Sequence, residues 1–90
     1  MTIPPSETTI FWLYCHYDIY PAGTPLTVQL KVDYGDAYYA MAPQNKVPLE
    51  VTYYAPPFEC DDDIRARVWW PGDEFKSKHI HILVREMGPA

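Results

Sequence analysis

A histidine pair separated by one residue is a candidate metal-binding arrangement, and this chain has one at His79 and His81. Residues two apart in a β-strand point to the same face, so both imidazoles would share it. With His16, or with a carboxylate such as Glu86, they would complete a zinc or iron site. A small metal-dependent β-barrel enzyme is therefore one hypothesis for this sequence, although the spacing alone is weak evidence.

A cysteine next to a histidine, at Cys15 and His16, suggests nucleophilic catalysis because a cysteine protease needs a thiolate and an imidazole. Neighbouring residues of a strand point to opposite faces, so these two side chains should diverge. Cys15 shares its parity with Phe11 and Leu13, which predicts a buried, inert thiol. Since the sequence has no phosphate-binding loop, nucleophile elbow or paired-carboxylate motif, we expect a non-catalytic protein without a cofactor.

Carboxylates gather in one stretch of the chain, at Glu59, Asp61, Asp62 and Asp63. Their spacing does not reproduce the glycine-containing calcium loop of an EF-hand. We expect a solvated acidic loop that keeps the adjoining apolar strand soluble. Because the net charge is −5, direct binding to nucleic acid is not expected, and a protein partner with a basic surface is favoured.

The two cysteines, Cys15 and Cys60, have no metal-ligand spacing and fit a reducing compartment. A disulfide between them remains an alternative. No apolar run approaches the roughly 20 residues that cross a bilayer, and the first residues do not resemble a secretion signal. We therefore expect a cytoplasmic protein that does not associate with membranes.

Aromatic residues make up 16% of the chain, more than a core of this size hides easily. Adjacent aromatic residues on a regular strand must send one ring outward. Three pairs have this property: Tyr38-Tyr39, Tyr53-Tyr54 and Trp69-Trp70. Outward Tyr and Trp rings dominate many interfaces because they bury a large area and keep a polar group. The expected binding surface combines such rings with nearby arginines: Tyr39, Tyr54, Arg65, Arg67 and Trp69.

The elements that position these residues are expected to be β-strands, since ten prolines disfavour long helices. The clearest strand covers 26–34, where apolar and polar residues alternate, and a Gly35-Asp36 turn would join it to a returning strand. Other strands are expected at 37–41, 49–54, 64–70 and 8–20. The segment 8–20 is apolar on both faces, and we favour cover by its own domain over contact with a partner.

The C-terminal segment fits either of two structures. Residues 76–87 alternate as a strand does, whereas helical spacing and end signals also fit a helix over about 73–87. The β-branched residues favour the strand. If this strand pairs with 64–70, setting Ala66 opposite Ile80 keeps core residues together.

This register has a consequence for metal binding. It sets Arg65 opposite His81 and Arg67 opposite His79, and therefore places positive charge where a metal ion would lie. Metal binding is accordingly disfavoured.

Together these patterns predict one all-β domain over 1–90, an antiparallel β-sandwich or open barrel of about six strands with a flexible N-terminal arm at 1–7. The favoured function is a non-catalytic binding module that docks on another protein, for instance as an inhibitor, adaptor or virion component. A carbohydrate-binding module and the metal-dependent enzyme are the alternatives. Open strand edges also allow a homodimer.

Overall fold

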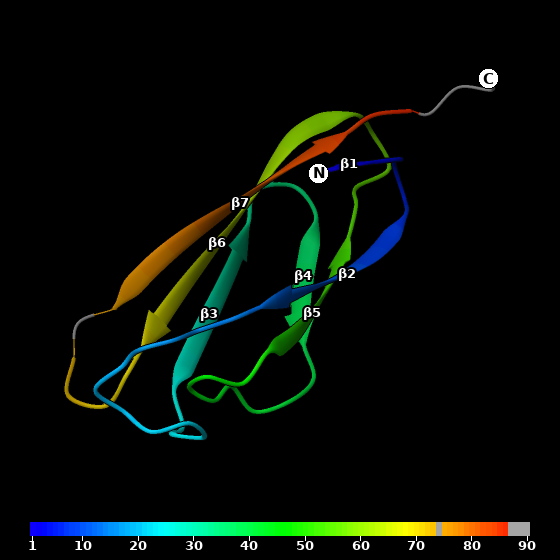
Figure 1. The fold of residues 1–90 in the computed structure, drawn as a ribbon. Coiled ribbons are helices and arrows are strands. Elements are labelled where there is room, and N and C mark those ends of the chain that lie inside the picture. Colours follow the sequence, from blue (N-terminus) through cyan, green and yellow to red (C-terminus); the bar gives the residue numbers. More distant parts are fainter. Residues whose placement is uncertain (74, 87–90) are drawn as a thin grey trace.

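Two β-sheets packed face to face make up this protein, in a computed structural model that describes residues 1–73 and 75–86 (Figure 1). The first sheet has the order β1 (Thr2–Ile3), β7 (Lys76–Val84), β6 (Cys60–Trp69) and β3 (Thr27–Val32). The second has the order β2 (Thr8–Leu13), β5 (Leu49–Tyr54) and β4 (Asp36–Tyr39). The described residues contain no helix, so the predicted all-β sandwich is confirmed, with seven strands instead of about six.

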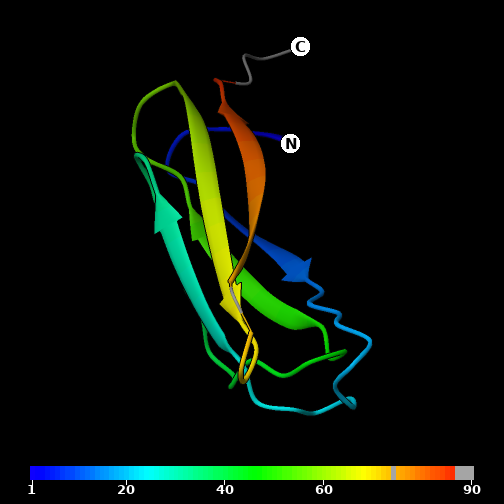
Figure 2. The ribbon, with the colours of Figure 1, turned by 90° about the vertical axis from the view of Figure 1, so that its left-hand side faces the viewer.

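Alternation of side chains places the core between the sheets. Inward positions of β6 hold Ile64, Ala66 and Val68, and those of β5 hold Val51 and Tyr53, all buried. Their outward neighbours are polar or half-exposed. Figure 2 shows that β7, which β1 covers only at Leu83 and Val84, lies on the same side of the sandwich as the edge strand β2.

The strand predicted over 8–20 ends earlier than expected. The chain leaves β2 at Leu13 instead of continuing as a strand to residue 20, and Tyr17 to Tyr20 form a turn. A buried side chain, Asn45, holds this loop: its Nδ2 donates to the carbonyl oxygens of Tyr17 and Tyr20, and its Oδ1 accepts from the Tyr17 amide and the Trp70 indole, each at 2.9 Å.

The predicted hairpin between 26–34 and 37–41 is wrong. β3 pairs with β6 and β4 pairs with β5, so the connection through Gly35 crosses from one sheet to the other. Asp62, which is fully buried, fixes this crossing by accepting hydrogen bonds from the amides of Tyr34 at 3.1 Å and Gly35 at 3.0 Å and from the Tyr53 hydroxyl. A Cβ at Gly35 would clash with the Tyr54 carbonyl oxygen, which explains the glycine.

The hairpin of β6 and β7 keeps the predicted parity, but its register differs by two residues. Ala66 lies opposite Lys78, not Ile80, and Ile64 lies opposite Ile80. The prediction failed because it began the strand at residue 64, whereas β6 begins at Cys60 and runs through the predicted acidic loop. It also assumed that inward positions are apolar, which Lys78 is not.

The N-terminal end of the chain differs from expectation, whereas the strand favoured for the C-terminal segment is confirmed. In the segment 1–7, which we predicted to be a flexible arm, β1 pairs in parallel with β7, and Ile3 is buried. The alternative helix over about 73–87 is wrong, since 76–84 form β7; residues 74 and 87 lie outside the described part. No helix long and apolar enough to span a membrane occurs among the described residues.

Candidate binding surface

The residues predicted to form one binding surface are divided between the two outer faces of the sandwich. Arg65, Arg67 and Trp69 point outward from β6 in the first sheet, whereas Tyr54 points outward from β5 in the second. Tyr39 lies on the inner side at the edge of β4, and its hydroxyl donates to the Val28 carbonyl oxygen at 2.8 Å. The outward ring of its pair is Tyr38.

The outer face of the second sheet carries the largest exposed apolar side chains of the strands. Four residues from three strands define what we call the aromatic face, with exposed fractions of 55% for Ile10, 61% for Trp12, 59% for Tyr38 and 45% for Tyr54. Ile10 and Tyr38 both lie opposite Thr52, and the rings of Tyr38 and Tyr54 meet edge to face, with centroids 5.9 Å apart. This is the face of segment 8–20 that we expected the domain itself to cover, and that prediction is wrong for the described residues.

Charge separates the two outer faces. The strands of the second sheet carry two charged residues, Asp36 and Glu50, both on the aromatic face. The outer face of the first sheet carries three of the seven basic residues, Lys31, Arg65 and Arg67, and two carboxylates, Asp61 and Asp63. Lys76 and Lys78 stand at inward positions of β7. The aromatic face is therefore apolar with an acidic rim, and the opposite face is polar and partly basic.

In the alternative hypothesis of a carbohydrate-binding module, an outward Trp69 would provide the aromatic platform for a sugar. In the structure the Phe75 ring packs against Trp69, with centroids 5.6 Å apart, and the Arg67 guanidinium lies 5.5 Å from the Phe75 centroid. Trp69 itself is half-buried. One side of this indole is thus in contact with protein instead of presenting a free stacking surface.

The two histidines of β7 meet a carboxylate. His79 Nδ1 lies 2.8 Å from Asp63 Oδ2, and His81 Nδ1 lies 3.9 Å from Asp63 Oδ1. Asp63 faces His81 across the pair of strands, and Arg65 faces His79, so neither of the two predicted pairs, Arg65 with His81 and Arg67 with His79, is correct. His16 is elsewhere, 2.8 Å from Asp18, and within 1–73 and 75–86 no three potential ligands are grouped to hold a metal ion.

The predicted acidic loop is part of β6, and its carboxylates have separate partners. Asp61 pairs with Arg85 at 2.5 Å, while Glu59 accepts a hydrogen bond from the Glu86 amide at 2.8 Å. Asp62 is the buried anchor described above. These residues tie strands together and do not form one acidic surface.

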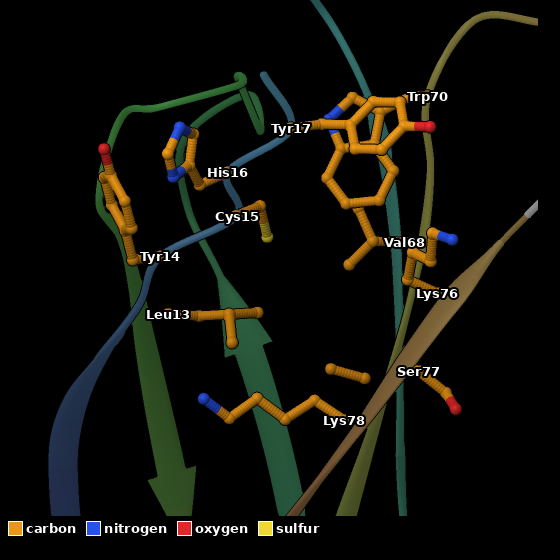
Figure 3. A pocket seen from close by; sticks show the side chains of 11 residues that line it. Leu13, Tyr14, Cys15, His16, Tyr17, Val68, Trp70, Lys76, Ser77 and Lys78 are labelled. Carbon is orange, nitrogen blue, oxygen red and sulfur yellow. The ribbon is translucent and has the colours of Figure 1, made fainter. Parts of the chain in front are cut away.

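Cys15 and His16 diverge, as predicted: Figure 3 shows the Cys15 thiol and the His16 ring pointing to different sides of the chain. Cys15 is buried, and burial raises the pKa of its thiol, with a smaller opposing effect of Lys78. Burial also raises the pKa of the Cys60 thiol. Both thiols are free.

The sequence interpretation missed three of the four residues of the aromatic face, Ile10, Trp12 and Tyr38. A signal for the first two was present, since 8–13 alternates inward residues with Ile10 and Trp12 on the other side. Comparison with protein-family models, curated proteins and solved structures finds no match to this chain. Its function is therefore inferred from its own side chains.

Proposed function

We propose that this protein is a non-catalytic binding module that docks on another protein through the aromatic face. The observation that carries the proposal is Trp12, the most exposed of four large apolar residues that lie side by side on one sheet. Several large exposed apolar side chains on one face, with polar groups among them, are typical of interaction sites, and Trp and Tyr are enriched among the residues that dominate binding energy.

The charged residues around the aromatic face indicate what kind of surface the partner has. Glu50 lies opposite Trp12, and Asp36 lies opposite Tyr54, while the three strands carry no lysine or arginine. A partner with an apolar patch and basic residues around it complements this arrangement. Such charges speed encounter and orient the complex, and the apolar centre supplies most of the affinity.

Carbohydrate binding and a homodimer through an edge strand have less support than protein binding. A sugar would need a free ring, whereas Trp69 is half-buried and in contact with Phe75. A homodimer through an edge strand is discouraged at β7, because Lys76 and Lys78 stand at inward positions of that strand, a common protection against edge pairing. We also place the protein in a reducing, cytoplasmic compartment, on the ground that both cysteines are free thiols.

Capture of partners from the source organism, at low and at high salt, tests this function. We expect one protein to be retained in stoichiometric amount and released by salt, because the rim charges are exposed. Size exclusion with light scattering is run on the protein alone and in the complex. A stable dimer of the protein alone that hides Trp12 from quenchers would contradict the proposal, since a second copy would then occupy the face.

A further inference from the structure

A cavity of about 310 Å³ opens on the side of the sandwich where β7 and β2 lie (Figure 3). One wall is the end of β2 and the residues after it, including Leu13 and Cys15. The other is formed by Ala66 and Val68 of β6 and by Trp70, which follows this strand. These side chains are apolar and belong to one core cluster. The volume lies at the lower end of the range for small-molecule pockets, about 300–1,000 Å³.

The cavity exists because two core positions of β7 hold lysine. Lys76 lies opposite Val68, and Lys78 lies opposite Ala66, so both lysines share the inward side of the sheet with these buried residues. Long charged side chains keep their ammonium groups in water and cannot fill an apolar space. The opposite wall cannot close the space either, because Asn45 holds the loop at Tyr17.

Both lysines border the cavity without an acidic partner among the described residues. The Lys78 side chain extends across the gap below Leu13, and the Lys76 ammonium lies 5.9 Å from the centre of the Tyr17 ring (Figure 3). Protection of a strand edge explains an inward lysine, but it needs no apolar cavity behind it. Apolar walls bordered by two lysines that make no salt bridge within 1–73 and 75–86 fit a ligand that is apolar at one end and anionic at the other.

We propose that this cavity binds a small amphiphilic carboxylate, whose apolar chain fills the cavity and whose carboxylate pairs with Lys76 and Lys78. Desolvation of the chain supplies the affinity, and the two ammonium groups select the anion over the alcohol of equal length. The aromatic face takes no part, so this site is independent of the protein-binding function.

Octanoate and 1-octanol are matched probes, since they share the chain length and differ in charge. Titration of each into ¹⁵N-labelled protein is followed at the Trp70 indole N–H and at the amides of Leu13 and Cys15. In a second measurement, alkylation of Cys15 and of Cys60 is followed by mass spectrometry, with and without octanoate. The variant K76Q/K78Q is compared with K31Q/K46Q, which removes the same charge from two lysines that do not line the cavity.

We expect octanoate to shift the Trp70 signal, to slow alkylation of Cys15 but not of Cys60, and to bind more tightly than 1-octanol. K76Q/K78Q should weaken octanoate binding about three- to tenfold, as expected for two partly exposed ion pairs, and K31Q/K46Q should not. Absence of a Trp70 shift and of Cys15 protection would overturn the proposal. Equal binding of the alcohol, or equal losses in the two variants, would overturn it as well.

Discussion

The rings of Tyr38 and Tyr54 meet edge to face on neighbouring strands, with centroids 5.9 Å apart, and both are open to solvent. Such a pair stabilises the sheet by only about 0.5–1.5 kcal/mol beyond the area it buries. Its position beside Ile10 and Trp12 is therefore better explained by binding than by folding. The predictions below separate residues that stabilise the fold from residues that are free to bind.

Truncation of two neighbouring residues on β2 should lower the free energy of unfolding by very different amounts. Trp12→Ser should change the free energy of unfolding by less than about 1 kcal/mol, because Trp12 is mostly exposed. Leu13→Ala, one residue further and buried, should cost about 2–5 kcal/mol. Urea unfolding of both variants makes the comparison, and a loss for Trp12→Ser as large as for Leu13→Ala would mean that Trp12 belongs to the core.

The buried carboxylate of Asp62 should be a main anchor of the crossing between the sheets. Asp62→Asn should lower the free energy of unfolding by about 2–3 kcal/mol, because its NH₂ group would face donors of Tyr34, Gly35 or Tyr53. The control is Asp61→Asn, which breaks only an exposed pair with Arg85 and should cost at most about 1 kcal/mol. If urea unfolding shows similar losses of stability for Asp62→Asn and Asp61→Asn, the buried carboxylate of Asp62 does not anchor the crossing.

Alkaline stability should depend on Tyr53. Burial, and then the hydrogen bond to Asp62, raise the pKa of Tyr53 well above its ordinary value of 10.0. Below about pH 10 the Tyr53 hydroxyl is protonated in the folded and in the unfolded chain, so it adds no pH dependence to the free energy of unfolding. Above about pH 10 the unfolded chain loses this proton while the folded chain keeps it. The free energy of unfolding should therefore fall as the pH rises above about 10.

Urea unfolding at about pH 9 and about pH 11 measures this dependence. Tyr53→Phe removes the ionisation and should fall less steeply with pH, even though the variant is less stable at the lower pH. Tyr20, whose pKa is raised by its hydrogen bond to Asp73, contributes equally to both proteins. Parallel slopes for wild type and variant would show that Tyr53 is not responsible.

Asn45 should order the loop that forms one wall of the cavity. Asn45→Ala removes the partners of the Tyr17 amide and the Trp70 indole, and we expect a loss of about 2–4 kcal/mol. Faster solvent exchange of the Trp70 indole N–H, measured by NMR, should accompany it. Gln44→Ala, at the half-buried neighbour, is the control and should leave the exchange rate unchanged.

Sequence patterns predicted the fold class because strand alternation is a local property. The inward parity of Cys15, Ile64 and Ile82 could be derived from residues two apart, and the structure confirms it by their burial. Register and sheet membership depend on distant residues instead. The alternation of β3 cannot reveal that it pairs with β6, nor that Gly35 carries the chain into the other sheet.

Charged residues at inward positions account for most of the errors. Asp62 was expected in a solvated loop, which shortened β6, and the register was chosen to set apolar residues opposite each other, whereas Ala66 lies opposite Lys78. Asp62 is inward because amide and hydroxyl donors surround it, and Lys78 because it borders an open cavity. Neither environment can be read from the neighbouring sequence, and the same holds for the division of the predicted binding residues between two faces.

The most direct test of the protein-binding function replaces side chains on one outer face of the sandwich at a time. Partner capture is compared for wild type, for W12S/Y38S on the aromatic face, and for R67S/W69S on the opposite sheet, all at equal protein concentration. We predict that W12S/Y38S loses the captured partner while remaining folded, and that R67S/W69S retains it. Retention by W12S/Y38S together with loss by R67S/W69S would contradict the assignment and place the binding site on the other sheet.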